Sequence, residues 1–426
     1  MVVGAGQGGL SVSYWLRGLD IEHVVLERSS IAASWRDNRW NSFCTVTPNW
    51  TIKLPGAEYA GDDPDGFMLR DELVRYFETW AHSFHCPIRC GIEVTGVRAR
   101  GDAFELDTGN GRYSARNVVI ATSNYQSVNI PSLATRLPGR VRQLTSHDYK
   151  SPATPAPGAV LVVGSGQTGC QIAEELNAAG RSTYHCVGRA GRLPRRYRGR
   201  DCLEWQRDMG YLERTPDMLD DPADRFRGDP HLSGKDGGRT LSLHDFHRDG
   251  ITLLGRLAGC EGERLLLDAD LHEQMRFSDE FCADILAKFD RHIASNGIDA
   301  PLPTATELAG GPPANGALPD IVRELDLARA GINTVIWATG YRFDFSWIEL
   351  PVLDASGYPD TTDGVSAHPG LCFVGLNWMT RRKSGILYGV GDDARRVSEH
   401  IAARVDGGAA ADRCASARGR AAAGQP

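Results

Sequence analysis

Residues Met1–Gly18, MVVGAGQGGLSVSYWLRG, and residues Ala159–Gly180, AVLVVGSGQTGCQIAEELNAAG, share one pattern. In each segment a short β-branched run leads into GxGxxG, and a helix-like stretch then ends at a glycine. This order predicts a strand, a tight turn and a helix. The two glycine motifs begin at Gly4 and Gly164, with no shorter repeat between them. The sequence therefore predicts an α/β protein with two Rossmann-like dinucleotide-binding domains.

The rest of the chain divides around these motifs. Residues 151–158, SPATPAPG, have the proline-rich composition of a linker. We expect the first domain to be discontinuous, formed by residues 1–150 and 311–405. We expect the second domain to span residues 159–310. Its segment Leu203–Leu241 is the candidate substrate-facing insertion, because the fold does not otherwise require it.

Other local signals place further elements. Strand-like runs lie at 24–27, 117–121 and 333–338. A helix is expected where Ser278 can cap its start and Gly297 can stop it. Residues 406–426 lose apolar periodicity, which predicts a disordered tail.

Composition narrows the class of protein. The chain has 426 residues, 41% of them hydrophobic and 24% charged, which is ordinary globular composition. A net charge of −7 disfavours a nucleic-acid or anionic-membrane partner. No apolar run is long enough to span a bilayer, and the amino terminus has no secretion-signal pattern. Ten scattered cysteines without a CxxC pair fit reduced thiols, so we expect a cytoplasmic enzyme.

The first glycine motif fits the dinucleotide signature in detail. Gly4 would make the tight turn, Gly6 would let a pyrophosphate approach the backbone, and Gly9 would let the helix pack close to the strand. Glu27 ends the next strand, 18 positions after Gly9, where a carboxylate can accept hydrogen bonds from a ribose diol. The alternative is that Glu27 is a surface acid at a strand end.

The second motif, Gly164, Gly166 and Gly169, has a different partner. Counting 18 positions from Gly169 reaches Val187, and Arg189 follows where the acid would sit. An arginine there suits a ribose carrying a 2′-phosphate and favours NADP over NAD. The alternative is a plain surface cation. Five more arginines follow, most of which we expect on a solvated face: Arg192, Arg195, Arg196, Arg198 and Arg200.

With an acid-marked and an arginine-marked site in one chain, the sequence resembles the class B flavin-containing monooxygenases. It looks still closer to their bacterial relatives often labelled as putative flavoproteins of potassium transport. The resemblance covers about Met1 to Ile401. It rests on Ala338–Thr339–Gly340–Tyr341 (ATGY), on the weaker Ala121–Thr122–Ser123, and on Thr145–Lys150, TSHDYK. In the last segment the family's signature histidine is replaced by Thr145. His147, two residues later, is a candidate substitute for it; the alternative is a surface histidine beside the linker.

The resemblance implies FAD on the first motif and NADPH on the second. It implies that Trp35, Arg36 and Trp40 belong to a turn that contacts the flavin; the alternative for Trp35 and Trp40 is that they are core aromatic residues. It assigns Asn49 to the flavin edge as the catalytic amide; an Asx turn after Pro48 is the alternative. The cofactor-binding residues expected from motifs and resemblance together are Gly4, Gly6, Gly9, Glu27, Trp35, Arg36, Trp40, Ala121, Thr122, Gly164, Gly166, Gly169, Arg189, Ala338, Thr339, Gly340, Ser384 and Gly385.

The implied activity is an NADPH-consuming monooxygenase that forms a C4a-hydroperoxyflavin and transfers one oxygen atom to a small-molecule nucleophile. The sequence does not choose between N-oxygenation, S-oxygenation and Baeyer–Villiger chemistry. Two alternatives stay open: an NADPH oxidase or reductase without oxygen transfer, and a non-catalytic FAD and NADP sensor. We expect O2 and a small molecule as partners and no metal site. A homodimer is left open.

Overall fold

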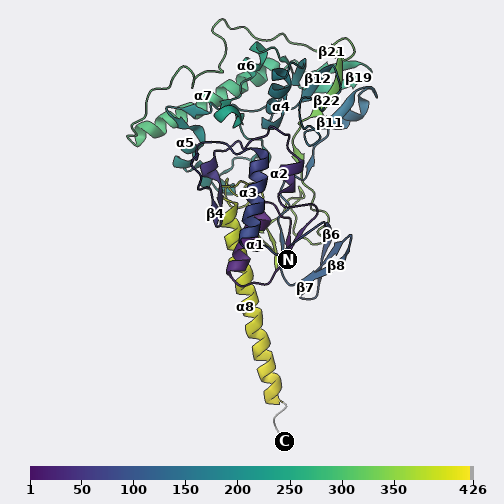
Figure 1. Ribbon diagram of the computed structural model, residues 1–426, viewed down its shortest axis with the longest axis vertical. Coiled ribbons are helices and arrows are strands. Elements are labelled where there is room, and N and C mark those ends of the chain that lie inside the picture. The colour runs from purple at the N-terminus through teal and green to yellow at the C-terminus, as the bar shows by residue number, and fades with distance from the viewer. Residues whose placement is uncertain (423–426) are drawn as a thin grey trace.

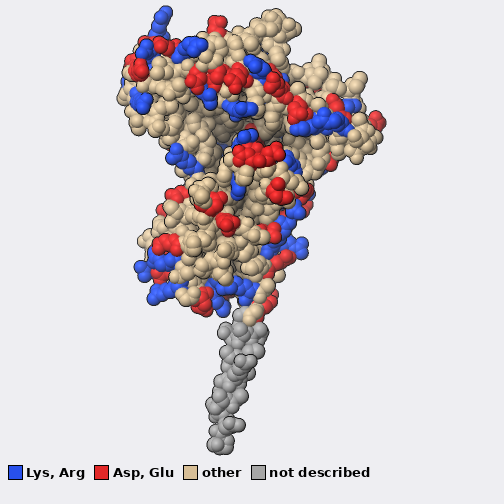
Figure 2. All heavy atoms as spheres, turned by 180° about the vertical axis from the view of Figure 1, so that it is seen from behind, with Lys and Arg blue, Asp and Glu red and all other residues tan. Residues whose placement is uncertain are grey.

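The computed structural model describes residues 1–422, with side chains over residues 1–407. The chain forms two α/β parts, one above the other in Figure 1, with the long helix α8 (Val390–Ala422) projecting from the lower part. Acidic and basic side chains are interspersed on the face seen in Figure 2. Among the helices of the described residues, none combines the length and the apolar character needed to cross a membrane.

The first sheet has seven strands in the order β24-β25-β26-β9-β1-β2-β5. The strands from β26 to β5 are parallel, and β24 and β25 add an antiparallel edge. Because the sheet joins strands from both ends of the chain, the first domain is discontinuous, as the sequence predicts. The bounds are β1 (Val2–Val3), β2 (Val25–Glu27), β5 (Ile88–Cys90), β9 (Val118–Ile120), β24 (Thr361–Thr362), β25 (Val365–Ser366) and β26 (Leu371–Phe373).

One face of this sheet is covered by three helices, α1 (Gln7–Gly18), α3 (Arg70–Ser83) and α8. Their apolar residues share one core with the sheet, including Leu16 of α1, Phe77 of α3 and Val397 of α8. This burial fixes α1, and therefore the glycine turn at its amino end, against the carboxyl ends of the strands.

The second sheet has five parallel strands in the order β11-β22-β12-β13-β18. Their bounds are β11 (Arg142–Thr145), β22 (Ile332–Trp337), β12 (Ala159–Val163), β13 (Thr183–Cys186) and β18 (Thr252–Leu254). Helices α4 (Gln167–Ala178), α6 (Leu243–Arg248) and α7 (Leu271–Ser295) belong to the same part. A small sheet of β19 (Leu257–Glu261), β20 (Arg264–Leu267) and β21 (Glu324–Asp326) adjoins it.

These strand pairings place the domain boundaries at other residues than the sequence-based prediction does. The prediction assigned residues 1–150 and 311–405 to the first domain, but β11 and β22 pair within the second sheet. The physical reason is that β22 is a buried central strand, and its two neighbours, β11 and β12, lie on either side of the linker in sequence. Proline-rich composition marks a break in secondary structure but does not say which sheet the flanking strands join.

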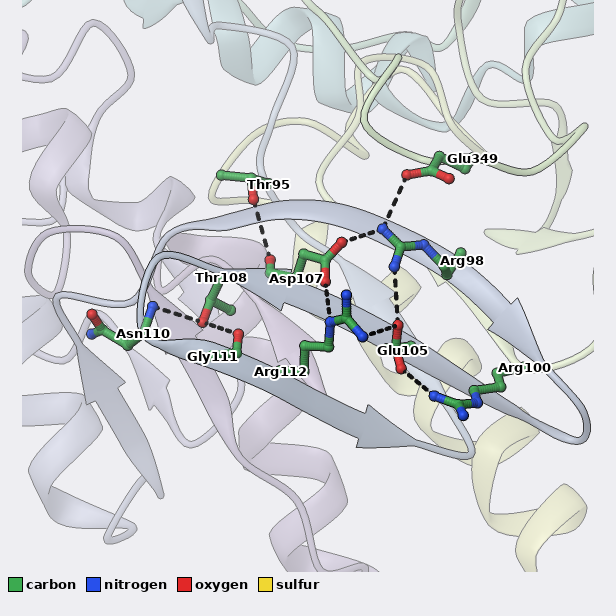
Figure 3. A network of polar contacts seen from close by, with 10 residues as sticks. All are labelled: Thr95, Arg98, Arg100, Glu105, Asp107, Thr108, Asn110, Gly111, Arg112 and Glu349. Atoms are coloured by element: carbon green, nitrogen blue, oxygen red, sulfur yellow. Dashed lines mark hydrogen bonds and ion pairs between the residues drawn. The ribbon is translucent and has the colours of Figure 1, made fainter.

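A third element is the antiparallel sheet of β6 (Val94–Arg100), β7 (Ala103–Thr108) and β8 (Gly111–Ala115). Its outer face carries the ion-pair network of Figure 3, in which Arg98 and Arg112 each contact both Glu105 and Asp107. Arg98 also reaches Glu349 at 3.4 Å. The network therefore ties this sheet to the segment after residue 343, which borders the site described below.

The remaining elements are short. They are α2 (Ala33–Asp37), β3 (Lys53–Leu54), β4 (Ala57–Glu58), β10 (Ser127–Val128), β14 (Arg196–Tyr197), β15 (Arg200–Asp201), α5 (Cys202–Asp208), β16 (Leu232–Ser233), β17 (Arg239–Thr240) and β23 (Tyr341–Arg342). Two helices differ from expectation. Helix α7 begins at Leu271, so Ser278 is buried within it and is not a cap. Helix α8 continues through most of the range expected to be disordered, where alanine favours a helix; residues 423–426 lie outside the described residues.

Candidate functional site: two glycine turns around one cavity

The first glycine turn lies between β1 and α1, at the carboxyl end of the first sheet. Gly4 has a φ of +102°, which favours glycine. A Cβ on Gly9 would lie 1.8 Å from the Gly4 carbonyl oxygen, so only glycine allows this helix-to-turn packing. A Cβ on Gly6 would have no heavy atom within 4 Å. Gly6 thus faces open space at the amino end of α1, where backbone N–H groups can bind a phosphate.

The second glycine turn repeats this geometry between β12 and α4. Gly164 has a φ of +106°, and a Cβ on Gly169 would lie 1.8 Å from the Gly164 oxygen. Gly166, like Gly6, has nothing within 4 Å of its Cβ position. Each motif thus forms an open cradle at a helix amino end.

The two ATG-type segments cross these turns in matching positions. A Cβ on Gly4 would lie 2.8 Å from the Ala121 oxygen, and one on Gly164 would lie 2.5 Å from the Ala338 oxygen. Thr122 follows Ala121 at the first turn, and Thr339 and Gly340 follow Ala338 at the second. The structure therefore brings each predicted segment against a different glycine turn.

A cavity of about 870 Å³ lies between the two parts. Its wall includes Gly4 and Gly6 of the first turn, and Gln167 and Thr168 at the amino end of α4. The predicted site residues on this wall are Gly4, Gly6, Glu27, Trp35, Ala121, Thr122 and Gly385. The first glycine motif and the amino end of α4 thus border one continuous space.

Glu27 ends β2 with its carboxylate on this wall and only 9% of its surface exposed. One oxygen accepts a hydrogen bond from the Ala5 N–H at 2.8 Å, and the other accepts from the Ser29 N–H at 2.9 Å. Each oxygen retains a further lone pair. The position and the chemistry therefore fit acceptance of hydrogen bonds from a ribose diol.

The arginines near the second turn are mostly engaged within the protein. Arg189 is exposed, and its guanidinium stacks 4.2 Å from the centre of the Phe277 ring. Arg195 makes a buried pair with Asp201, at 2.7 and 2.6 Å. The other four arginines also bind protein groups. Their partners are Asp279 for Arg192, the Gly237 oxygen for Arg196, Asp290 for Arg198 and Asp208 for Arg200. Arg189 is exposed after β13, and its role as a phosphate ligand stays a prediction.

Four predicted flavin-contact or catalytic residues do not line the cavity. Arg36 pairs with Glu78 of α3 at 2.5 Å, and Trp40 packs edge-on against Phe43 in the core. Asn49 is buried, and its side-chain amide donates to the Asp63 oxygen at 2.9 Å. The residues before it, 45–47, do reach the wall.

Ser384 is the fourth of these residues. Its hydroxyl accepts hydrogen bonds from the N–H groups of Thr380 and Arg381, so it shapes the turn before α8. The neighbouring Gly385 lies on the wall, and its carbonyl accepts from the Gln7 side chain at 2.8 Å. We expected backbone contacts from both residues; Gly385 borders the cavity and Ser384 does not, so the contact with a ligand stays a prediction for Gly385.

Arg39 is a wall residue that sequence reasoning missed. Its guanidinium lies 5.5 Å from the Trp35 ring centre and 5.6 Å from that of Phe43, and it donates to the Tyr341 hydroxyl at 3.4 Å. Tyr125, also missed, packs edge-on against Tyr341 at 5.2 Å. Helical spacing gave no signal for Arg39, because α2 ends at Asp37 and Arg39 lies in the bend that follows it.

His147 lies beside the same tyrosine, with its ring 5.4 Å from that of Tyr341. Burial, together with the charges of Arg39 and Lys150, lowers the pKa of His147 to about 4. The imidazole is therefore neutral at physiological pH. It does not line the cavity, so its substitution for the family histidine is not supported by position.

The insertion contributes part of the cavity wall. Leu203, Gln206, Tyr211, Leu212 and Asp229 all border the cavity. The cavity wall thus includes residues of the predicted insertion, and its contact with a substrate stays a prediction. Within the described residues, no group of three or more His, Cys, Asp or Glu could hold a metal ion, and the cysteines described are free thiols.

Comparison with known proteins places this arrangement in a family. Residues 1–196 match the family model described as pyridine nucleotide-disulphide oxidoreductase. An oxidoreductase of Geobacillus kaustophilus, named as CzcO-like, is 30% identical over 404 residues, which cover 94% of this chain and 97% of that protein.

Two solved structures share the fold. A flavin-containing monooxygenase from Stenotrophomonas maltophilia aligns with a TM-score of 0.64 and 19% identity, covering 95% of this chain and 98% of that one. OTEMO, in a complex with FAD and NADP, aligns with a TM-score of 0.57 and 16% identity, covering 96% of this chain and 84% of that one. The predicted resemblance to flavin monooxygenases is thus confirmed in the fold. Because the chain matches the Geobacillus kaustophilus protein in sequence over nearly its whole length, it belongs to the CzcO-like oxidoreductases.

Proposed function

We propose that this chain is an FAD-dependent, NADPH-consuming monooxygenase that transfers one oxygen atom to a small-molecule nucleophile. The observation that carries the proposal is a cavity bordered by both the first glycine turn and the amino end of α4. A dinucleotide at each turn would extend into this one space. Electron transfer between two dinucleotides requires that kind of shared space.

The first cradle suits FAD. Gly6 leaves room for a pyrophosphate at the amino end of α1, and Glu27 can accept from the adenosine ribose. Gly385 and the following residues, 386–387, lie on the wall where backbone groups could meet the ring system. When bound, FAD would take electrons from NADPH and pass them to O2.

The second cradle suits NADPH. Gly166 leaves the matching space at the amino end of α4. Arg189 follows β13 and is exposed, so it can reach a 2′-phosphate while stacking on Phe277. The task of the chain is then to orient the two nucleotides and to exclude water between them. Tyr125, Tyr341 and Trp347 supply an aromatic part of the wall for this purpose.

The test uses the purified full chain. It should be yellow, and anaerobic NADPH should bleach it faster than NADH does. In air, NADPH and O2 consumption should be measured with a panel of an amine, a thioether and a ketone. The proposal requires that at least one compound gain a single atom of labelled oxygen from O2 while hydrogen peroxide release falls. A colourless protein that does not take up added FAD would refute it.

An NADPH oxidase without oxygen transfer is a second candidate. It is favoured by Asn49, because the amide expected to act on the reacting oxygen binds the Asp63 backbone instead of facing the cavity. Thr145, which replaces the family histidine, binds Asp148. Peroxide release equal to NADPH consumption with every compound tested would favour the oxidase. In that case Asn49→Ala would leave the ratio of peroxide released to NADPH consumed unchanged.

A further inference from the structure

A five-residue run of the insertion crosses the amino-terminal turn of α4. We call residues 229–233 the strap. The side-chain amide of Gln167 donates to the Pro230 oxygen at 2.8 Å, and that of Gln171 donates to the Leu232 oxygen at 3.1 Å. Both amides belong to the first turns of α4, so the strap lies directly beside the second cradle.

His231 fastens the strap to the glycine turn itself. Its N–H donates to the Gly191 oxygen at 2.8 Å, and its ring Nε2 contacts the Ser165 oxygen. The ring is 1% exposed, and burial lowers its pKa to about 4. The neutral ring can therefore donate its Nε2–H to Ser165. Because this contact is buried, the strap has a fixed position next to Gly166.

Arg382 reaches the strap from the other domain. It follows β26, and its side chain is 14% exposed, while its partner Asp229 on the strap is 48% exposed. Both residues line the cavity. A guanidinium that is mostly shielded from solvent at a cavity wall needs an anion, and here an exposed, more easily displaced carboxylate supplies it.

The neighbours of this pair locate it relative to the second cradle. Asp229 immediately precedes Pro230, which contacts Gln167 at the first position of α4. Asp229 thus sets a negative charge near a helix amino end, a position that also favours phosphate. Arg382 has the planar donor geometry that binds phosphate oxygens in pairs.

We propose that Arg382 binds the pyrophosphate of the dinucleotide held at the second glycine turn, and that Asp229 occupies its guanidinium until that nucleotide arrives. This inference rests on the proposed function of the second site. The entering phosphate takes over Arg382, and the Asp229 carboxylate turns to water. One residue of the flavin-side domain thereby senses occupancy of the other domain.

The experiment measures binding of two probes to the purified holoprotein. NADP⁺ carries the pyrophosphate, whereas adenosine 2′-monophosphate carries the 2′-phosphate without it. Arg382→Gln should weaken NADP⁺ binding about 10- to 100-fold and leave the monophosphate unaffected. Asp229→Asn should tighten NADP⁺ binding several-fold, because it removes the competing anion. Arg382→Lys, which keeps the charge, should lie between Arg382→Gln and the wild type.

Glu213→Gln is the matched control. Glu213 pairs with Arg381 and Lys383 in a similar contact between the insertion and the same segment, but it does not line the cavity. We expect unchanged NADP⁺ affinity. If Asp229→Asn weakens NADP⁺ as much as Arg382→Gln does, the pair is only architectural and the inference is wrong. Unchanged affinity in Arg382→Gln overturns the inference alone. A wild type that binds neither probe overturns the proposed function as well.

Discussion

Gly6→Ala separates ligand binding from folding at the first glycine turn. A methyl group at Gly6 meets no protein atom within 4 Å and requires no unusual φ, since Gly6 has a φ of −85°. As Gly6 is the N-cap of α1, the loss of stability should stay below about 1 kcal/mol. The methyl projects into the cradle, where overpacking against a bound pyrophosphate costs about 1–3 kcal/mol. We therefore expect FAD affinity to fall roughly 5- to 150-fold.

Gly9→Ala should behave in the opposite way. Its Cβ would lie 1.8 Å from the Gly4 oxygen, so the backbone must move. We expect a loss of about 1–3 kcal/mol or more in the free energy of unfolding of the flavin-free protein. Gly166→Ala provides the control at the second turn. It should weaken NADP⁺ binding and leave the FAD content of the protein unchanged.

The assay titrates flavin-free protein with FAD and follows flavin fluorescence, with thermal unfolding of the same samples. Wild-type FAD affinity in Gly6→Ala would refute the assignment of a pyrophosphate to this cradle. Equal loss of stability in Gly6→Ala and Gly9→Ala would show that a methyl group at Gly6 meets protein atoms, which would contradict the open cradle.

Three further predictions test the ribose site at Glu27 and the contributions of buried charged and titratable groups to stability. Glu27→Gln should weaken FAD by about tenfold or more, because charged acceptors make the stronger hydrogen bonds; an unchanged affinity in the same titration would remove Glu27 from the ribose site. Burial lowers the pKa values of His185 and His231 from 6.5 to about 4, so the unfolded state binds more protons below pH 6.5. Stability should therefore fall as pH decreases from about 6.5 toward 4, by roughly 2 kcal/mol per histidine at pH 5 in urea unfolding, and His185→Gln should reduce this loss. Arg195→Met strands the buried Asp201 carboxylate and should cost about 3–5 kcal/mol in urea unfolding, whereas a loss under 1 kcal/mol would mean that Asp201 finds water.

The elements nearest the glycine motifs were predictable because their signals are local. A β-branched run, GxGxxG and a stop glycine specify strand, turn and helix within about 20 residues, and both units form as expected. Gly180, which follows α4, has a φ of +76° and ends that helix as its position predicts. Glu27 also needed only local spacing, since a strand end and a turn in one βαβ unit must meet.

The misplaced residues share a different cause. The expectation for Asn49 came from a motif position, but its orientation depends on residues 63–66, which contact it across a loop. The arginine run after Gly188 gave no sign of its partners, because Asp279 and Asp290 lie on α7, far along the chain. Charge pairing of this kind is a property of packing and cannot be read from the run itself.

By itself the sequence determined that there are two nucleotide cradles, which one has the acid and which the arginine, and that the first domain is built from both ends of the chain. Only the tertiary structure decided that the first cradle and the amino end of α4 border one cavity, and that β11 and β22 join the second sheet. It also decided that Arg39 and Arg382 reach the cavity wall. The physical reason is range: turns and helices are specified by neighbours in sequence, whereas sheet order and cavity walls arise from burying surfaces contributed by distant segments.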